Sequence, residues 1–298
     1  MSEDSKEKIY AVGFKGFDPD MKCQGKQYAE NEIFEEKTAE ICNSGMHFCE
    51  NPLDVLDYYP LLTGDCKLNE FATVEALAEA TTEDKKSVTT KLKVGFKLGL
   101  KGFVEAAVAF SLEWLKKVDY SVKNAASSGF GSQLASSGKY SKLASSGDES
   151  QLASSGDYSK LASSGKYSKL ASSGDSSQLA SSGKYSQLAS SGFGSQLASS
   201  GKYSQLASSG DYSKLASSGD YCSVEATGEK CVIAATGRDS KVKGALGCFI
   251  ACAEWALDKN YNWHPVAFKS AKVDGKKIKA DTWYTVKNGK FVEVKDGE

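Results

Sequence analysis

The stretch Gly156-Asp-Tyr-Ser-Lys-Leu-Ala-Ser-Ser-Gly165-Lys-Tyr-Ser-Lys-Leu-Ala-Ser-Ser-Gly174 decides the fold of the middle of this chain. It holds two copies of the unit Gly-x-x-Ser-x-Leu-Ala-Ser-Ser, and thirteen glycines at an unbroken spacing of nine run from Gly129 to Gly237. A fixed short period indicates stacked units that contact only their neighbours. Nine residues are too few for a helical hairpin, and Ser, Gly and Tyr are poor helix formers. Each unit is therefore predicted to be a short strand and a tight turn of a β-solenoid.

Two units are expected to complete one coil, as in β-rolls built from nonapeptides. A coil then takes eighteen residues, and the twelve glycine-to-glycine intervals give six coils. With neighbouring strands about 4.8 Å apart, the stack would be roughly 29 Å long. Leucine fills one slot in ten successive units, from Leu134 to Leu215, and Val224, Ile233 and Val242 continue it. We expect this slot to face the core.

The serine two residues before each leucine should also point inward, because side chains alternate along a strand. Ser141 and Ser150 are examples, and the Gln or Lys between serine and leucine should face water. Glycine is expected to supply the corner, which other residues turn less readily. The small Ala-Ser-Ser segment allows close stacking of coils.

An eighteen-residue spacing sorts the residues that follow the glycines into two columns. The first column is basic at its middle, whereas the second is mainly acidic. The first column contains Phe130, Asp148, Lys166, Lys184, Lys202, Asp220 and Arg238. The second column contains Lys139, Asp157, Asp175, Phe193, Asp211 and Glu229.

Tyrosines accompany both columns, and contact surfaces favour aromatic and basic side chains. Three lysines in a row repel one another, and this motivates the hypothesis that their face meets an acidic partner. The alternative is an ordinary solvated surface with ladder stacking. The candidate binding residues are Lys166, Lys184, Lys202, Tyr167, Tyr185 and Tyr203.

Three known solenoid functions do not fit the repeat. Calcium-binding rolls need an Asp in every unit, but here the first variable slot changes between Lys, Asp and Phe. An ice-binding face would need regular threonine rows, and this repeat has serine. From Gly129 to Tyr221 there are eight Lys against six Asp and Glu, which argues against DNA mimicry. The same weak balance argues against nucleic-acid binding, which needs a concentrated basic surface.

Composition sets further limits on location and chemistry. The chain has 298 residues, a net charge of −1 and eight cysteines without a CxxC pair. It has no run of eighteen apolar residues and a polar N-terminus, so we expect no membrane span, no signal peptide and a cytoplasmic location in a host cell. No metal and no cofactor are expected. Cys222 and Cys231 replace consecutive inward serines and are expected to face each other inside one coil, as packing residues or as a redox pair.

The non-repetitive ends are predicted to form separate parts. The first 100 residues should hold strands at 9–17, 26–34 and 71–80, and a short helix capped by Asn51-Pro52. The apolar face of the following helix should close the open first coil, and Asn-Gly and Asp-Gly turns predict hairpins after the solenoid. The four predicted parts are an α+β domain at 1–100, a capping helix at 101–118, the β-solenoid at 119–243 and an antiparallel β cap at 244–298.

Both ends of the chain resemble an uncharacterised family of phage and bacterial proteins. The resemblance rests on Met21-Lys-Cys-Gln-Gly-Lys-Gln-Tyr, Gly45-Met-His-Phe-Cys-Glu-Asn-Pro-Leu-Asp-Val-Leu-Asp-Tyr-Tyr, Lys243-Gly-Ala-Leu-Gly-Cys, Ala253-Glu-Trp and Val273-Asp-Gly-Lys-Lys-Ile-Lys-Ala-Asp-Thr-Trp-Tyr. Proteins of that family similarly continue from this N-terminal domain into Ser/Gly repeats. The resemblance implies a phage or prophage setting and brings no activity with it.

A weaker resemblance links Gly45-Met-His-Phe-Cys and Tyr58 to the strand and helix of ADP-ribosyltransferases. Such enzymes would need a His or Arg on an early strand, where this chain has Lys15. They would also need a catalytic Glu on a later strand, for which Glu75 is the nearest candidate. His47 is expected to be a core histidine and His264 a surface residue.

We therefore expect a non-enzymatic β-solenoid protein that binds a macromolecular partner. The expected partner is a host protein or protein complex, and host-defence proteins are among the candidates. No catalytic residue is assigned. One alternative is an ADP-ribosyltransferase-like enzyme or nucleotide binder in the N-terminal domain. Another is a structural protein that self-assembles into a homo-oligomer through its solenoid faces.

Overall fold

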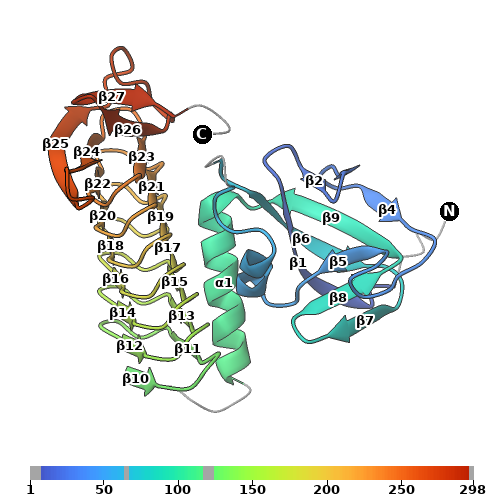
Figure 1. Ribbon diagram of the computed structural model, residues 1–298. Helices are drawn as coiled ribbons and strands as arrows, with labels where there is room; N and C mark the ends of the chain where they lie inside the picture. Colours follow the sequence, from blue (N-terminus) through green and yellow to red (C-terminus); the bar gives the residue numbers. More distant parts are fainter. Residues whose placement is uncertain (1–7, 64–66, 117–123, 295–298) are drawn as a thin grey trace. The chain divides into compact units, whose positions relative to one another are not determined.

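The computed structural model describes residues 8–63, 67–116 and 124–294 (Figure 1). The chain divides into two compact units, of which the first comprises residues 1–63 and 67–103 and the second residues 64–66 and 104–298. No helix in the described ranges is long and apolar enough to span a membrane.

The first unit is built mainly from short antiparallel strands around an aromatic core. Phe17, Tyr28 and Phe34 form a chain of tilted ring contacts in this core. A four-stranded sheet has the order β1 (Ala11–Phe17), β6 (Glu70–Ala76), β9 (Lys91–Lys97) and β4 (Ile33–Glu35). A three-stranded sheet has the order β5 (Met46–Phe48), β8 (Lys86–Thr89) and β7 (Ala80–Glu83), and β2 (Lys22–Cys23) pairs with β3 (Lys26–Gln27).

Local signals in this unit were only partly predictive. The single strand expected at 26–34 is divided between β3 and β4. The helix that follows Asn51 is a 3-10 helix, η1 (Pro52–Asp57), and the Asn51 side chain accepts a hydrogen bond from the backbone of Leu53 at 3.0 Å. Asparagine in this role satisfies one of the free amides at a helix start. Strands β7, β8 and β9 were not predicted, although β9 alternates between lysine and the apolar residues Leu92, Val94 and Phe96.

The second unit is a β-solenoid of about seven coils over residues 124–252, one more than the six that the glycine count predicted. The additional coil comes from 124–127 and 249–252, which lie outside the glycine series. From β10 (Asn124–Ser127) to β23 (Lys241–Gly244) each strand pairs in parallel with the strand eighteen residues away, as Leu152 with Leu170 and Leu161 with Leu179. This register confirms that two units form one coil. The last parallel pair, β22 (Val232–Ala235) with β24 (Phe249–Leu257), has an offset of seventeen residues.

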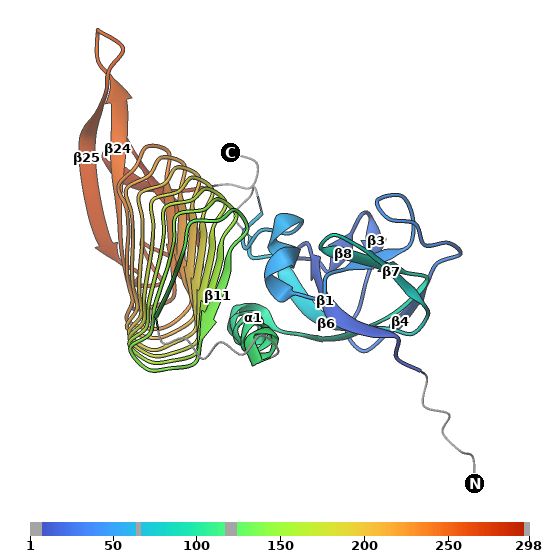
Figure 2. The same cartoon turned by 90° about the horizontal axis from the view of Figure 1, so that it is seen from below.

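The coils build two sheets that face each other across the leucine core (Figure 2). We call the first the exposed sheet; it contains β10 (Asn124–Ser127), β12 (Lys142–Ser145), β14 (Lys160–Ser163), β16 (Gln178–Ser181), β18 (Gln196–Ser199), β20 (Lys214–Ser217), β22 (Val232–Ala235), β24 (Phe249–Leu257) and β25 (Trp263–Lys272). We call the second the covered sheet; it contains β11 (Gln133–Ser136), β13 (Gln151–Ser154), β15 (Lys169–Ser172), β17 (Gln187–Ser190), β19 (Gln205–Ser208), β21 (Ser223–Ala226), β23 (Lys241–Gly244), β26 (Tyr284–Lys287) and β27 (Lys290–Glu293).

The outer faces of the two sheets differ, although their repeats are nearly identical. On the covered sheet the outward side chains of Lys169 and Ala171 are buried, whereas on the exposed sheet those of Lys160 and Ala162 are exposed. Figures 1 and 2 show the helix α1 (Gly99–Lys116) lying along the coils beside the covered sheet, with its axis along the stack. Its residues from Val104 onward belong to the same unit as the coils. The helix was expected to close the open first coil, but it lies along the stack.

The core of the coils is a leucine column with serine pairs at its corners. The leucines from Leu143 to Leu215 are at most 2% exposed. Ser150 is fully buried, and its hydroxyl donates to the Gly147 carbonyl at 2.7 Å and contacts the Ser145 hydroxyl at 2.6 Å. The prediction that leucine and the preceding serine both point inward is therefore confirmed. Ser159 and Ser168 make the same two contacts within their own turns, as buried polar groups normally do, whereas the buried hydroxyls of Ser172 and Ser217 have no hydrogen-bond partner.

The turn glycines are needed for close approach between coils. A Cβ atom on Gly183 would lie 1.8 Å from the carbonyl oxygen of Gly165 in the coil below. The same clash recurs along the stack, whereas none of the repeat glycines has a positive φ angle. The corner was expected to need the conformational freedom of glycine, but what it needs is the absence of a side chain.

The last coil is closed by antiparallel strands. β25 pairs with β24, and β26 pairs with both β23 and β27. Asn288 and Gly289 form the hairpin turn between β26 and β27, as the Asn-Gly signal predicted, and the Glu254 carboxylate accepts hydrogen bonds from both backbone amides at 2.7 and 2.8 Å. Pro265 lies in β25, which is the edge strand of its sheet. A proline there is tolerated because no further strand needs its missing backbone amide for hydrogen bonding.

Replacing Gly183 with alanine should destabilise the solenoid by about 1–3 kcal/mol or more, because the new methyl group must push two backbones apart. The matched control is Gly129→Ala in the first coil, where the nearest atom to a new Cβ is the Ser132 hydroxyl at 3.4 Å. Chemical unfolding followed by far-UV circular dichroism measures both. Equal destabilisation of the two variants would show that close approach is not the reason for the glycine.

Removal of 156–173 should be tolerated, because it takes out one complete coil and joins equivalent strands. Removal of 156–164 should be far more damaging, because it takes out half a coil. Every later strand of the exposed sheet would then lie in the covered sheet, and every later strand of the covered sheet in the exposed sheet. Thermal unfolding of the two deletion variants measures the difference. A nine-residue deletion as stable as the eighteen-residue deletion would contradict the two-unit coil.

Candidate functional site

The predicted binding residues lie on one edge of the solenoid, in the turns that lead from the exposed sheet to the covered sheet. These turns occupy 164–168, 182–186 and 200–204, and each reads Ser-Gly-Lys-Tyr-Ser. We call this surface the tyrosine–lysine edge; it consists of Lys166, Tyr167, Lys184, Tyr185, Lys202, Tyr203, Asp220 and Tyr221. The structure thus brings all six predicted residues together, on a narrow edge of turns and not on a flat sheet face.

The tyrosine rings of this edge form a continuous stack. Tyr167, Tyr185, Tyr203 and Tyr221 follow one another with ring centroids 5.0 Å apart and interplanar angles of 5–6°. Each of these tyrosine residues is 40–51% exposed. Because the rings cover each other's faces, a partner can reach mainly their rims and hydroxyl groups. This geometry is unsuited to stacking of a base or a sugar on an open ring face.

Each tyrosine of this stack adopts a backbone conformation that non-glycine residues rarely take. Tyr185 has a φ angle of 59°, in the left-handed region, and the other stacked tyrosines are alike. This conformation costs roughly 1–2 kcal/mol for a residue with a Cβ atom. It lets the Tyr185 amide donate to the Lys202 carbonyl of the next coil at 2.9 Å. Aromatic contacts, worth about 0.5–1.5 kcal/mol per pair, help to offset the cost.

Substitutions at Tyr185 should show a reversed preference between glycine and alanine. Tyr185→Ala loses the stacking and keeps the left-handed strain, whereas Tyr185→Gly loses the stacking and relieves the strain, so the glycine variant should be more stable by about 1 kcal/mol. At the neighbouring Lys184, whose φ angle is not positive, alanine should be the more stable choice. Urea unfolding of the four variants tests this, and an alanine variant at 185 that equals or exceeds the glycine variant would contradict it.

Aspartates on both edges bridge successive coils. The Asp148 carboxylate accepts a hydrogen bond from the Lys166 amide at 2.8 Å, and Asp175 accepts one from Phe193 at 2.8 Å on the opposite edge. Asp220 lies 2.9 Å from the Lys202 ammonium and 3.2 Å from the Arg238 guanidinium. Partial burial would raise the pKa of Asp220, but its bonds to Lys202 and to the Arg238 backbone outweigh this and lower the pKa. The lysine row is therefore neutralised at Lys202, contrary to the expectation of an unpaired row.

The opposite edge of turns is mainly acidic and has its own aromatic contacts. Tyr140 and Tyr158 stack at 5.1 Å, and Phe193 lies 5.0 Å from Tyr212 at a tilt of 44°. Lys139, the one lysine of its predicted column, pairs with Asp157 at 3.1 Å. The two edges therefore present surfaces of different charge, as the two sequence columns predicted.

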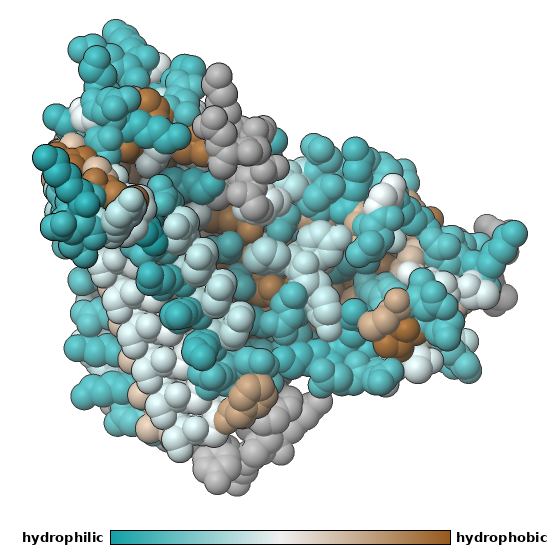
Figure 3. Space-filling model, in the orientation of Figure 1, coloured by the Kyte–Doolittle hydropathy of each residue, from teal (hydrophilic) through white to brown (hydrophobic). Residues whose placement is uncertain are grey.

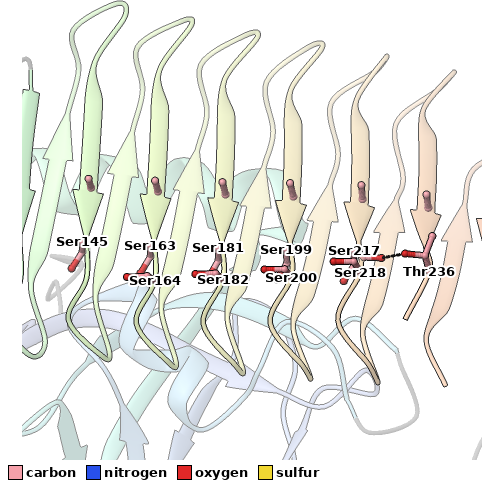
Figure 4. Close-up of a pocket in the computed structure, with 16 residues that line it drawn as sticks. Ser145, Ser163, Ser164, Ser181, Ser182, Ser199, Ser200, Ser217, Ser218 and Thr236 are labelled. Carbon is pink, nitrogen blue, oxygen red and sulfur yellow. Dashed lines mark hydrogen bonds between the residues drawn. The ribbon is translucent and has the colours of Figure 1, made fainter. Parts of the chain in front are cut away.

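A long groove on the exposed sheet was not predicted from the sequence. It has a volume of about 630 Å³ and runs across six coils, over the outward Ala and Ser positions from Ala144 to Thr236 (Figure 4). Along the coils, Figure 3 shows a column of near-neutral hydropathy flanked by hydrophilic side chains, and apolar side chains are more frequent at the hairpin end. There Trp255, Val266 and Phe268 line an adjoining hollow that also includes Thr236. The sequence feature that could have indicated this groove is the small Ala-Ser-Ser segment, which recurs in every coil.

The first unit contains a separate pocket of about 390 Å³ that includes Lys15 and His47. The backbone amide of Cys42 donates to His47 Nε2 at 3.1 Å, and burial followed by the charges of Lys86 and Lys15 lowers the pKa of His47. Glu75 is not part of this pocket, and it pairs with Lys93 at 3.0 Å. His264 is exposed on β25.

The inward cysteines are arranged differently from the expectation. Cys222 and Cys231 lie at opposite edges of the coil, where their thiols donate to the carbonyls of Gly201 at 3.2 Å and Gly210 at 3.4 Å. They therefore do not face each other, because nine residues are half a coil. The described cysteines are all free, and no group of three His, Cys, Asp or Glu suited to a metal ion occurs within 8–63, 67–116 and 124–294.

Comparison with known proteins adds one finding about the first unit. Residues 11–106 match a domain of unknown function, DUF7666. No curated protein and no solved structure matches the chain. This match is consistent with the expectation of an uncharacterised family, and it covers the N-terminal region only.

Proposed function

We propose that this chain is a non-enzymatic binding protein that holds an acidic surface of a macromolecular partner on its tyrosine–lysine edge. The observation that carries the proposal is the repetition of the same Lys-Tyr pair in three consecutive turns of a hydrogen-bonded stack. Its consequence is a row of side chains whose spacing is fixed before any partner arrives.

Preorganisation favours a binding role for this edge. Tyr185 is fixed by rings on both sides and by its backbone bond to the next coil. Ordering a free side chain on binding costs about 0.5–1.5 kcal/mol, and much of that cost is already met in this stack. Tyrosine also offers a large contact area and a hydroxyl group at its rim, and it is enriched among the residues that dominate binding energy.

The charge of this edge favours an acidic partner. The three central turns carry Lys166, Lys184 and Lys202 and no acidic residue, while Asp148 and Asp220 lie in the turns on either side. All three lysines are exposed. A short basic row between acidic ends favours a partner with one acidic patch of matching length over a uniformly charged polymer such as nucleic acid. Such complementarity acts mainly on the association rate and on specificity.

The setting that we propose is a phage or prophage protein in the cytoplasm of a bacterial host, with a host protein or a component of host defence as the partner. The family resemblance of both chain ends supports this setting. The solenoid supports the binding role, because a rigid stack can present one surface at constant spacing.

A second candidate function is self-assembly through the exposed sheet. The groove along the Ala and Ser positions favours it, because small side chains allow another flat surface to approach closely. The lysines Lys142, Lys160 and Lys214 project from the same face and are exposed, so a second copy would have to accommodate their charge. This lysine column supplies a matched control for the experiment on the edge.

The triple change of Lys166, Lys184 and Lys202 to Glu should leave the fold intact, because the side chains are exposed, and should weaken capture of the partner. Immobilised protein is exposed to bacterial host lysate, and retained proteins are quantified by mass spectrometry. The partner retained by the parent protein should be lost in this variant. Its association with the parent should also slow strongly as salt is raised.

The control changes Lys142, Lys160 and Lys214 to Glu, with the same alteration in net charge but on the exposed sheet. It should retain the partner. If the edge variant folds and captures the partner with unchanged rate and salt response, the proposal is wrong. Loss of capture in the sheet variant alone would move the contact to the exposed sheet.

A further inference from the structure

The pocket of the first unit combines two lysines with aromatic walls and is independent of the solenoid edge. Its volume of about 390 Å³ lies in the lower part of the range for small-molecule sites, roughly 300–1,000 Å³. Strands β1, β5 and β8 and the segment around η1 contribute to it. The walls include Phe14, Phe48 and Tyr58.

Lys15 is held in this pocket by close packing of the strand around it. It is 4% exposed, and its ammonium group donates to the backbone carbonyl of His47 at 2.7 Å. A Cβ atom on Gly13 would lie 2.6 Å from the Cys49 carbonyl oxygen, and one on Gly16 would lie 2.6 Å from Tyr59. The glycines before and after Lys15 thus let strand β1 approach the pocket wall closely. Burial lowers the pKa of Lys15. Burying the charged amino group costs free energy, and an uncharged residue such as methionine at this position would avoid that cost.

Lys86 provides the second positive charge. Its ammonium group lies 4.1 Å from the centre of the Tyr58 ring and 3.7 Å from the Cys42 sulfur. A cation over an aromatic face is stabilised by the ring but is not neutralised by it. The nearby Asp57 carboxylate is engaged by Lys85 at 3.4 Å.

The pocket therefore holds two lysines and no carboxylate, and the Cys23 thiol interacts with Lys15. Its fifteen lining residues include Lys15, Lys86 and His47 and no Asp or Glu. The lowered pKa of His47 agrees with this, because Lys86 and Lys15 both disfavour a further positive charge. Buried charges in proteins are normally paired. A pocket with two ammonium groups and no carboxylate is suited to a ligand that brings the negative charge.

We propose that this pocket binds a small organic anion, whose acidic group pairs with Lys15 and Lys86 and whose apolar body contacts Phe14, Phe48 and Tyr58. A phosphate and a carboxylate share the required chemistry. Phenyl phosphate and benzoate carry the same ring with different acidic groups, so they separate the two sources. Benzyl alcohol is the uncharged counterpart.

The experiment is a titration of the full-length protein with these three probes, followed by NMR shifts of the aromatic and methyl signals and by calorimetry. At least one anion should bind, and benzyl alcohol should bind at least about tenfold more weakly, because charge-assisted bonds are lost. Binding of phenyl phosphate alone, of benzoate alone or of both supports the site and identifies the acidic group. Failure of both anions at millimolar concentration, or equal binding of benzyl alcohol, would overturn the proposal.

Variants locate the binding. Lys86→Met and Lys15→Met should each weaken the anion about tenfold or more. Lys93→Met in the same unit, whose lysine pairs with Glu75 outside the pocket, should leave the affinity unchanged. If Lys15→Met fails to fold, Lys86→Met still decides the matter, since an unchanged affinity in that variant excludes the site. The outcome does not depend on the tyrosine–lysine edge, which these variants leave intact.

Discussion

The contact on which the solenoid depends is the approach of each turn glycine to the carbonyl group of the glycine one coil below. A Cβ atom at Gly165, Gly183 or Gly201 would lie 1.8–1.9 Å from that oxygen. Because the turns approach so closely, the strands pair without a register shift and every slot repeats after eighteen residues. The leucine core, the corner serines and the surface columns all follow from this spacing. A side chain at the glycine slot would separate the coils and misalign all of them.

This spacing also explains the surface. A residue repeated at one slot meets its own copy about 4.8 Å away, which is close to the stacking distance of aromatic rings. Tyrosine therefore stacks on tyrosine at 5.0 Å even though its backbone must be left-handed. Lysines that occupy the same slot in successive coils repel one another. The row of three lysines is bounded by Asp148 at one end and by Asp220 at the other. A binding edge can thus be varied one turn at a time while the frame stays the same.

Much of the solenoid could be predicted because its signals are periodic and local. The spacing of Leu143 and Leu161 predicts the core and the register, and the Asn288-Gly289 pair predicts the last hairpin. The extra coil was missed because 124–127 and 249–252 lack the glycine series. The left-handed backbone of the tyrosines was not predictable, because it depends on contacts between coils. The burial of Lys169 was not predictable either, because it depends on what covers the sheet. The pocket around Lys15 gathers residues from distant segments, and no spacing in the sequence reports that.

The most direct test of the account is the distance between two spin labels at positions 146 and 218, directly after strands β12 and β20 of the exposed sheet. The labels are introduced through a non-natural amino acid so that the native thiols are not labelled. These positions are 72 residues apart, which is four coils when a coil takes eighteen residues. Pulsed electron paramagnetic resonance should give a narrow distribution near 19 Å, allowing for the label linkers. One unit per coil would instead require eight coils and about 38 Å. A distance near that value, or a broad distribution, would contradict the stacked frame on which both the core and the tyrosine–lysine edge depend.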